Sequence, residues 1–64
     1  MENRYAAAVS GKGDAELLQI LRERAGYEAE AILAAADEAE RRNLPVPNLG
    51  HIKQDALHQY TLQQ

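Results

Sequence analysis

The 64-residue chain contains no cysteine, no tryptophan and no phenylalanine. Without cysteine it cannot form disulfides or thiolate metal sites, and this suits a reducing compartment such as the cytoplasm, where we expect the protein to reside. A chain of this length buries only ~60% of its unfolded surface, and many of its apolar residues are small alanines. The composition therefore predicts one domain over residues 1–64, with a thin core that benefits from a partner subunit.

Basic residues are too few for a nucleic-acid-binding surface. Ten acidic residues outnumber seven lysines and arginines, so the net charge is −3, and the basic residues are scattered along the chain. Because neutralisation of phosphates supplies most nucleic-acid affinity, we expect no nucleic-acid partner. No stretch approaches the ~20 apolar residues that cross a bilayer, and the N-terminus lacks the features of a signal peptide, so we also expect no membrane partner.

The chain also lacks the apolar–polar alternation that is typical of β-strands, which predicts an all-α fold. The stretch "SGKG", residues 10–13, is too short for a phosphate-binding loop, which needs a longer glycine-rich pattern after a buried strand. Its two glycines favour a turn instead. Residues 1–13 are therefore expected to form an N-terminal arm, in which "YAAAV" can make one or two helical turns.

Two amphipathic segments follow the arm. The first spans about 14–25, where Gly13 or Asp14 can cap the helix and Gly26 is the expected left-handed stop. The second spans about 28–42, with acids at its start, arginines at its end and acid-first pairs from Asp37 to Arg41 and from Glu38 to Arg42. Because so few residues separate them, we predict an antiparallel helical hairpin over 14–44. Their apolar faces comprise Leu17, Leu18, Ile20, Leu21 and Ala25 in the first segment, and Ala29, Ile32, Leu33, Ala35, Ala36 and Ala39 in the second.

A third helix is expected over about 49–60, after an extended "LPVPN" connector in residues 44–48. Asn43 can close the second helix, and Asn48 is a plausible cap for the third. Lys53 interrupts the apolar face of this helix. That face comprises Leu49, Ile52, Ala56, Leu57 and Tyr60.

Two charged residues project toward the apolar faces of the predicted hairpin. Glu40 lies on the alanine-rich face, and a hairpin that turns near Gly26 brings it level with the start of the first helix. We therefore expect Glu40 to contact that helix end or Lys12. Arg24 projects into the apolar stripe of the first helix, where its stem can cover apolar contacts while its guanidinium pairs with Glu28. A partner-binding arginine is the alternative for Arg24.

The residues His51, Asp55 and His58 share one face of the predicted third helix. Two imidazoles and a carboxylate in this arrangement can bind zinc. A catalytic zinc also needs a water pocket and groups that orient its ligands, and one short exposed helix supplies neither. The simpler interpretation is a solvated polar face. Most carboxylates also lie on outer helix faces beside arginines, where nothing shifts their pKa toward acid–base catalysis, so we predict no enzyme and no cofactor.

The stretch "RYAAAVSGKGDAELLQILRERAGYEAEAILAAADEAERRNL" resembles a small helical segment that recurs in bacterial proteins, often those of Bacteroidetes. The family pattern runs Tyr, Ser-Asp-x-Glu-Leu, Tyr-x-Pro-Glu-Ala and Glu-x-x-Arg-Arg-x-Leu. It commonly stands ahead of membrane domains or on small proteins, and it carries no catalytic motif. Gly13 and Ala29 depart from its capping Ser and its helix-starting Pro. The resemblance implies a helical hairpin and a bacterial origin. The matching positions are Tyr5, Asp14, Glu16, Leu17, Leu18, Tyr27, Glu30, Ala31, Glu40, Arg41, Arg42 and Leu44.

The functional hypothesis is a non-enzymatic helical protein–protein interaction module that associates with itself. The apolar face of the first helix is wider than one alanine-rich helix can cover, and a dimer with two-fold symmetry is the commonest way to bury such a surplus. Two alternatives stay open: a small metal-binding protein that uses His51, Asp55 and His58, and an acidic helical regulator that binds a basic partner. The predicted interface comprises Leu17, Leu18, Ile20, Leu21, Arg24, Leu49, Ile52, Leu57 and Tyr60.

Overall fold

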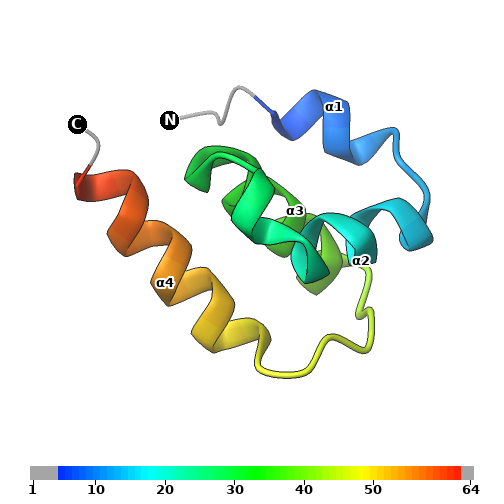
Figure 1. Cartoon of the computed structure of the whole chain (residues 1–64). Coiled ribbons are helices and arrows are strands. Elements are labelled where there is room, and N and C mark those ends of the chain that lie inside the picture. The colour runs from blue at the N-terminus through cyan, green and yellow to red at the C-terminus, as the bar shows by residue number, and fades with distance from the viewer. Residues whose placement is uncertain (1–4, 63–64) are drawn as a thin grey trace.

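Four α-helices and one short 3-10 helix make up the fold of residues 5–62, the part of the chain that the structure describes. The structure is a computed structural model, and no strand occurs in this range. The predicted all-α fold class is therefore confirmed. In chain order the elements are α1 (Ala6–Ser10), α2 (Asp14–Arg22), the 3-10 helix η1 (Arg24–Gly26), α3 (Ala29–Arg41) and α4 (Leu49–Leu62), as Figure 1 shows.

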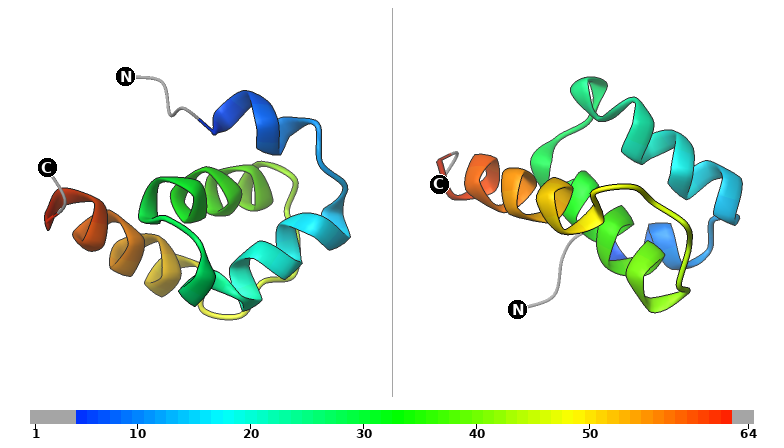
Figure 2. Two further views of the ribbon diagram at one scale, coloured as in Figure 1. Left: turned by 45° about the horizontal axis from the view of Figure 1, so that its top comes forward. Right: turned by 90° about the horizontal axis from the view of Figure 1, so that it is seen from below.

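The central element is α3, which contacts α1, α2 and α4 and makes its most extensive contact with α4. Figures 1 and 2 show α4 running roughly antiparallel beside α3, while α1 and α2 lie on its other sides. Because three neighbours cover α3, its buried residues extend beyond the predicted face to Ala31 and Ala34. α2 and α3 do contact each other, but their pairing as a separate antiparallel hairpin stays a prediction.

The core consists of a few large aliphatic residues packed against alanines. Leu17 and Leu21 of α2 are fully buried, and they belong to the same cluster as Ala35, Ala36 and Ala39, which have no exposed surface. Alanine on a central helix lets the neighbouring helices approach closely. The radius of gyration is 10.6 Å, against the ~10.7 Å expected for a compact chain of this length. The third predicted helix therefore packs on its own chain and does not swing away from it.

The junction between α2 and α3 differs from the predicted glycine stop. α2 ends at Arg22, and the chain then tightens into η1, where Gly26 N–H donates to the Glu23 carbonyl and Tyr27 N–H to the Arg24 carbonyl. None of the glycines within residues 5–62 has a positive φ, so the left-handed stop at Gly26 is wrong. The reversal comes instead from the 3-10 turn followed by extended backbone at Tyr27 and Glu28.

The C-terminal end of α3 is closed by Asn43, as predicted. Asn43 has a φ of 59°, a left-handed conformation that asparagine tolerates better than most residues. The Leu44 N–H donates to the Ala39 carbonyl at 2.9 Å, and the Asn43 N–H to the Glu40 carbonyl at 3.1 Å. These two bonds form a Schellman motif, which satisfies carbonyls that the helix end would otherwise leave open.

The connector from α3 to α4 is a short extended strap. The Val46 N–H donates to the Leu44 carbonyl at 2.9 Å, so a tight turn is centred on Pro45. Asn48 is also left-handed, with a φ of 58°, and its carbonyl accepts a bond from the Ile52 N–H at 2.9 Å. Asn48 therefore begins α4 through its backbone.

Arg42 joins three helices at one end of the molecule. Its Nε donates to Glu38 Oε2 at 2.8 Å, its Nη1 to Asp14 Oδ1 at 2.8 Å and its Nη2 to the Ser10 carbonyl at 3.1 Å. These bonds, first that to Asp14 and then that to Glu38, raise the pKa of Arg42 above its ordinary value. The predicted pair of Glu38 and Arg42 is present. The predicted pair of Asp37 and Arg41 is not, because Arg41 contacts the buried carboxylate of Glu38 at 2.8 Å and Asp37 pairs with Lys53.

Glu40 does not contact Lys12 or the start of α2, so that prediction is wrong. Its Oε1 atom accepts a hydrogen bond from Lys53 Nζ of α4 at 2.8 Å, and the same ammonium lies 3.0 Å from Asp37 Oδ1. The hydrogen bonds to Glu40 and then Asp37 raise the pKa of Lys53. The prediction failed because α4, rather than α2, lies beside this side of α3. Lys12 instead pairs with Glu16, at 3.6 Å.

Candidate functional site

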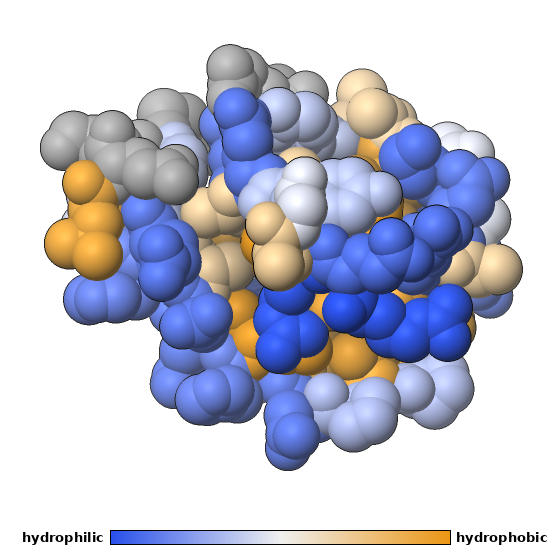
Figure 3. Space-filling model, viewed as in Figure 1, coloured by the Kyte–Doolittle hydropathy of each residue, from blue (hydrophilic) through white to orange (hydrophobic). Residues whose placement is uncertain are grey.

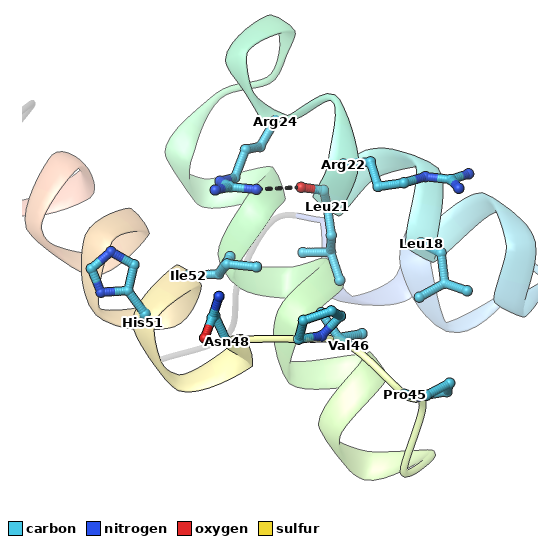
Figure 4. A pocket seen from close by; sticks show the side chains of 10 residues that line it. Leu18, Leu21, Arg22, Arg24, Pro45, Val46, Asn48, His51 and Ile52 are labelled. Carbon is cyan, nitrogen blue, oxygen red and sulfur yellow. Dashed lines mark hydrogen bonds between the residues drawn. The ribbon is translucent and has the colours of Figure 1, made fainter.

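A groove of about 440 Å³ lies between the C-terminal part of α2, the connector and the first turn of α4 (Figure 4). Its floor is apolar: Leu21 and Ile52 are buried, while Leu18 and Val46 are half-buried. The groove exists because the proline-containing connector crosses from α3 to α4 as an extended strap, which leaves the flank of α2 only partly covered. Figure 3 shows hydrophobic surface framed by strongly hydrophilic residues in the lower part of the molecule, where the connector runs.

Two arginines form the side of the groove opposite the connector. Figure 4 shows Arg22 and Arg24 along this side, with the guanidinium of Arg24 above Ile52. Arg24 Nη1 donates to the Leu21 carbonyl at 2.8 Å, which holds the guanidinium at the C-terminal end of α2, where a cation is favourable. The predicted pair of Arg24 with Glu28 does not form.

Glu28 has a different partner, since its carboxylate accepts a hydrogen bond from the Tyr5 hydroxyl. Glu28 also precedes the first residue of α3 as its N-cap. This carboxylate therefore connects the segment before α1 to the start of α3.

The two groove arginines differ from the other described cations because they have no acidic partner. Within residues 5–62, each lysine and arginine outside the groove has an acidic partner within 4 Å, whereas Arg22 and Arg24 have none. No acidic residue lines the groove. A chain with a net charge of −3 thus carries a local concentration of unneutralised positive charge beside an apolar floor. The paired cations are Lys12, Arg41, Arg42 and Lys53.

A second hollow of about 520 Å³ lies on the other side of the same arginines. It is lined by Arg22 and Arg24 together with Asp55 and Gln59 of α4. Asp55 forms no ion pair with either arginine among the described residues. This hollow is more polar than the groove, and it has no comparable aliphatic floor.

The residues of the predicted interface fall into three environments. Four belong to the core of their own chain, three are half-buried and two are exposed. Leu57 is 54% exposed. It lies on α4 one turn beyond Lys53, and the antiparallel register that joins Lys53 to Asp37 brings it level with half-buried Leu33 of α3. The core group is Leu17, Ile20, Leu21 and Ile52, the half-buried group is Leu18, Leu49 and Tyr60, and the exposed pair is Arg24 and Leu57.

The candidate metal ligands on α4 are exposed and do not converge. His51 lines the groove, whereas Asp55 lines the second hollow. In the described part of the chain, no group of three or more His, Asp or Glu residues is placed to bind a metal ion. His58 projects from the same helix into solvent.

The sequence predicted Arg24 and part of the groove floor, but it did not predict Arg22 or the wall that connector residues 45–48 form. One signal for Arg22 was present. Residues 18, 19, 25 and 26, which are three or four positions away on a helix, include no acid that could neutralise it. The connector wall depends on the path of residues 45–48 across α2, which no periodic pattern describes.

Comparisons of the chain with protein-family models, with curated proteins and with solved structures found no match. Within residues 5–62, no helix combines the length and the apolar character that crossing a bilayer requires. The resemblance to the bacterial helical segment therefore stays a prediction, and functional inference rests on the geometry of the chain itself.

Proposed function

We propose that the chain is a non-catalytic helical protein–protein interaction module that pairs with a second copy of itself. The observation that carries this proposal is the exposure of Leu57, which is 54% exposed on α4. A large aliphatic side chain in water is common, but the register set by the Lys53–Asp37 ion pair indicates that this one lies on the α4 surface level with half-buried Leu33 of α3. We call this surface, defined by Leu33 and Leu57, the α3–α4 face.

The surroundings of the α3–α4 face suit an interface with a second copy. Lys53 and Asp37, each one turn from one of the two leucines, form an ion pair, and Glu40 also pairs with Lys53. These three residues supply a polar edge to a small apolar centre. This arrangement of an apolar centre with a polar rim is typical of protein interfaces. A two-fold axis through the face would bring each Leu57 against the apolar centre of the other copy, because identical surfaces meet in such pairing.

The charged residues support a structural role over a catalytic one. Asp14, Glu38, Asp37 and Glu40 each accept ion pairs that join one helix to another or close a helix end. Catalytic carboxylates are instead arranged around a pocket with a shifted pKa. The proposal also differs from the broader predicted interface, since four of those residues already fill the core of their own chain.

Sedimentation equilibrium tests the proposal. At about 100 µM, wild-type protein should sediment with twice the chain mass of 7.1 kDa and dissociate on dilution, because association depends on concentration. Leu57→Lys should be monomeric and remain helical. Leu62→Lys is the matched control, since Leu62 is a still more exposed leucine, 68% exposed, on another side of the same helix. A wild-type monomer at this concentration, or equal dissociation by both variants, would contradict the proposal.

A further inference from the structure

We propose that the groove between α2 and α4 binds a short acidic segment of a partner protein. One aliphatic side chain of that segment rests on the apolar floor, and its flanking carboxylates bind Arg22 and Arg24. This site is separate from the α3–α4 face, so it does not depend on pairing between copies of the chain.

Charge complementarity identifies the occupant as anionic. Arg22 and Arg24 are the described cations without an acidic partner, and they stand together on one side of one groove. A guanidinium has five N–H donors, and the bond from Arg24 to the Leu21 carbonyl uses one of them. The remaining donors can bind a carboxylate in the two-bond geometry that arginine favours.

The floor of the groove requires that the occupant also be apolar. Leu18 and Val46 are half-buried and Leu21 and Ile52 are buried, so the floor presents aliphatic side chains that cannot solvate a charge. An aliphatic side chain placed between Leu18 and Val46 would remove their remaining apolar surface from water. Pro45 holds the connector in a fixed conformation, so this wall exists before binding and little ordering entropy is lost.

The groove is widely open to solvent, which favours a protein segment over a small molecule as its occupant. Most of the residues around its opening are exposed, including Pro45, Pro47, Asn48 and His51. Sites for small molecules usually bury ~70–90% of the ligand surface. A free carboxylate with a short alkyl tail would stay largely in water here, whereas a protein segment would cover the opening with its own neighbouring residues.

Titration of the ¹⁵N-labelled full chain, followed by ¹H–¹⁵N correlation spectra, tests this site. The probe is a peptide with two leucines flanked on each side by two aspartates, acetylated and amidated at its ends. It should shift the amides of Leu18, Val46 and Ile52 with a Kd below about 1 mM. The double variant Arg22→Gln/Arg24→Gln should weaken binding by about tenfold, the loss expected for two partly exposed arginine–carboxylate pairs.

The control is Arg41→Gln, which removes one positive charge, against two in the double variant, from an arginine of α3 whose side chain is 70% exposed and which lies outside the groove. Its Kd should stay within about twofold of wild type. Peptides with asparagine for aspartate, or serine for leucine, should also bind about tenfold more weakly. No binding by the acidic peptide, equal binding by the double variant, or shifts confined to another surface would overturn the proposal. Octanoate that binds the groove as tightly as the peptide would overturn it too, by identifying the occupant as a small carboxylate.

Discussion

The Nη1 atom of Arg42 lies 2.8 Å from the Oδ1 atom of Asp14, a residue 28 positions earlier in the chain. Asp14 is the first residue of α2, and Arg42 follows the last residue of α3. The ion pair thus places an anion at a helix N-terminus and a cation at a helix C-terminus, which both helix dipoles favour. With the bond from Arg42 to the Ser10 carbonyl, it fastens the ends of α1, α2 and α3 together.

Replacing Arg42 should therefore destabilise the fold more than replacing its neighbour. Arg42→Gln removes the bonds to Asp14, to Ser10 and to buried Glu38, whereas Arg41→Gln removes only the bond from an exposed side chain to Glu38. Thermal unfolding followed by circular dichroism should show a fall in Tm of several degrees for Arg42→Gln and a clearly smaller fall for Arg41→Gln. Equal falls in Tm would show that the contacts with α1 and α2 contribute little.

The alanines of α3 should tolerate no enlargement. Ala36 has no exposed surface and contacts the core cluster, so Ala36→Leu has to displace neighbouring helices. We expect a loss of about 1–3 kcal/mol in the free energy of unfolding, the usual cost of overpacking. Urea denaturation measures it, and Ala15→Leu on the exposed side of α2 is the control, with an expected change near zero. If Ala36→Leu were as stable as wild type, the helices around α3 would pack more loosely than the structure shows.

The left-handed backbone at Asn43 predicts an unusual order of substitutions. Asn43→Ala should cost about 1 kcal/mol, because a Cβ without a compensating polar group is disfavoured at positive φ. Asn43→Gly should be neutral or slightly stabilising, since glycine adopts this conformation without a steric penalty. The φ of 59° is the basis for this order, and chemical denaturation of both variants checks it. An alanine variant more stable than the glycine variant would contradict it.

The pairs that Lys53 makes with Glu40 and Asp37 predict a loss of stability in alkali. Because the folded state raises the pKa of Lys53 above its ordinary value of 10.5, the stabilisation is complete below that pH and is lost as pH rises through the higher folded-state value. The difference in unfolding free energy between wild type and Lys53→Met should thus be constant from neutral pH to about 10 and then shrink. Comparison with the variant separates this effect from the ionisation of the tyrosines. A difference that does not change with pH would count against the ion pairs.

Local signals in the sequence predicted much of the fold. Asn43 closes α3 because asparagine accepts a left-handed conformation and the following proline cannot continue a helix. The bounds of α3 and α4 agree with the periodic apolar pattern to within two residues. The early end of α2 was not predictable in the same way, since a 3-10 turn at residues 24–26 leaves no distinctive spacing.

Tertiary partners were harder to predict than helices. Glu40 interrupts the apolar face of α3, and Lys53 interrupts that of α4. The structure gives one reason for both, since the two side chains bind each other. Assigning Glu40 to Lys12 followed from treating α2 as the main neighbour of α3, whereas α4 makes the larger contact. The groove was not predicted for a related reason. Arg22 lines a groove only because the connector passes opposite α2, and the sequence does not reveal that path.

The central position of α3 has a consequence for how the chain is synthesised. α4 covers the largest part of α3, and it is the last described helix to leave the ribosome. Until α4 emerges, the core lacks Ile52 and Ala56, and Glu40 lacks its partner Lys53. The nascent chain therefore exposes one side of α3. At ~5–20 residues per second this interval lasts only a few seconds. The native fold is therefore completed after translation of α4, and chains released earlier should be substrates for proteases.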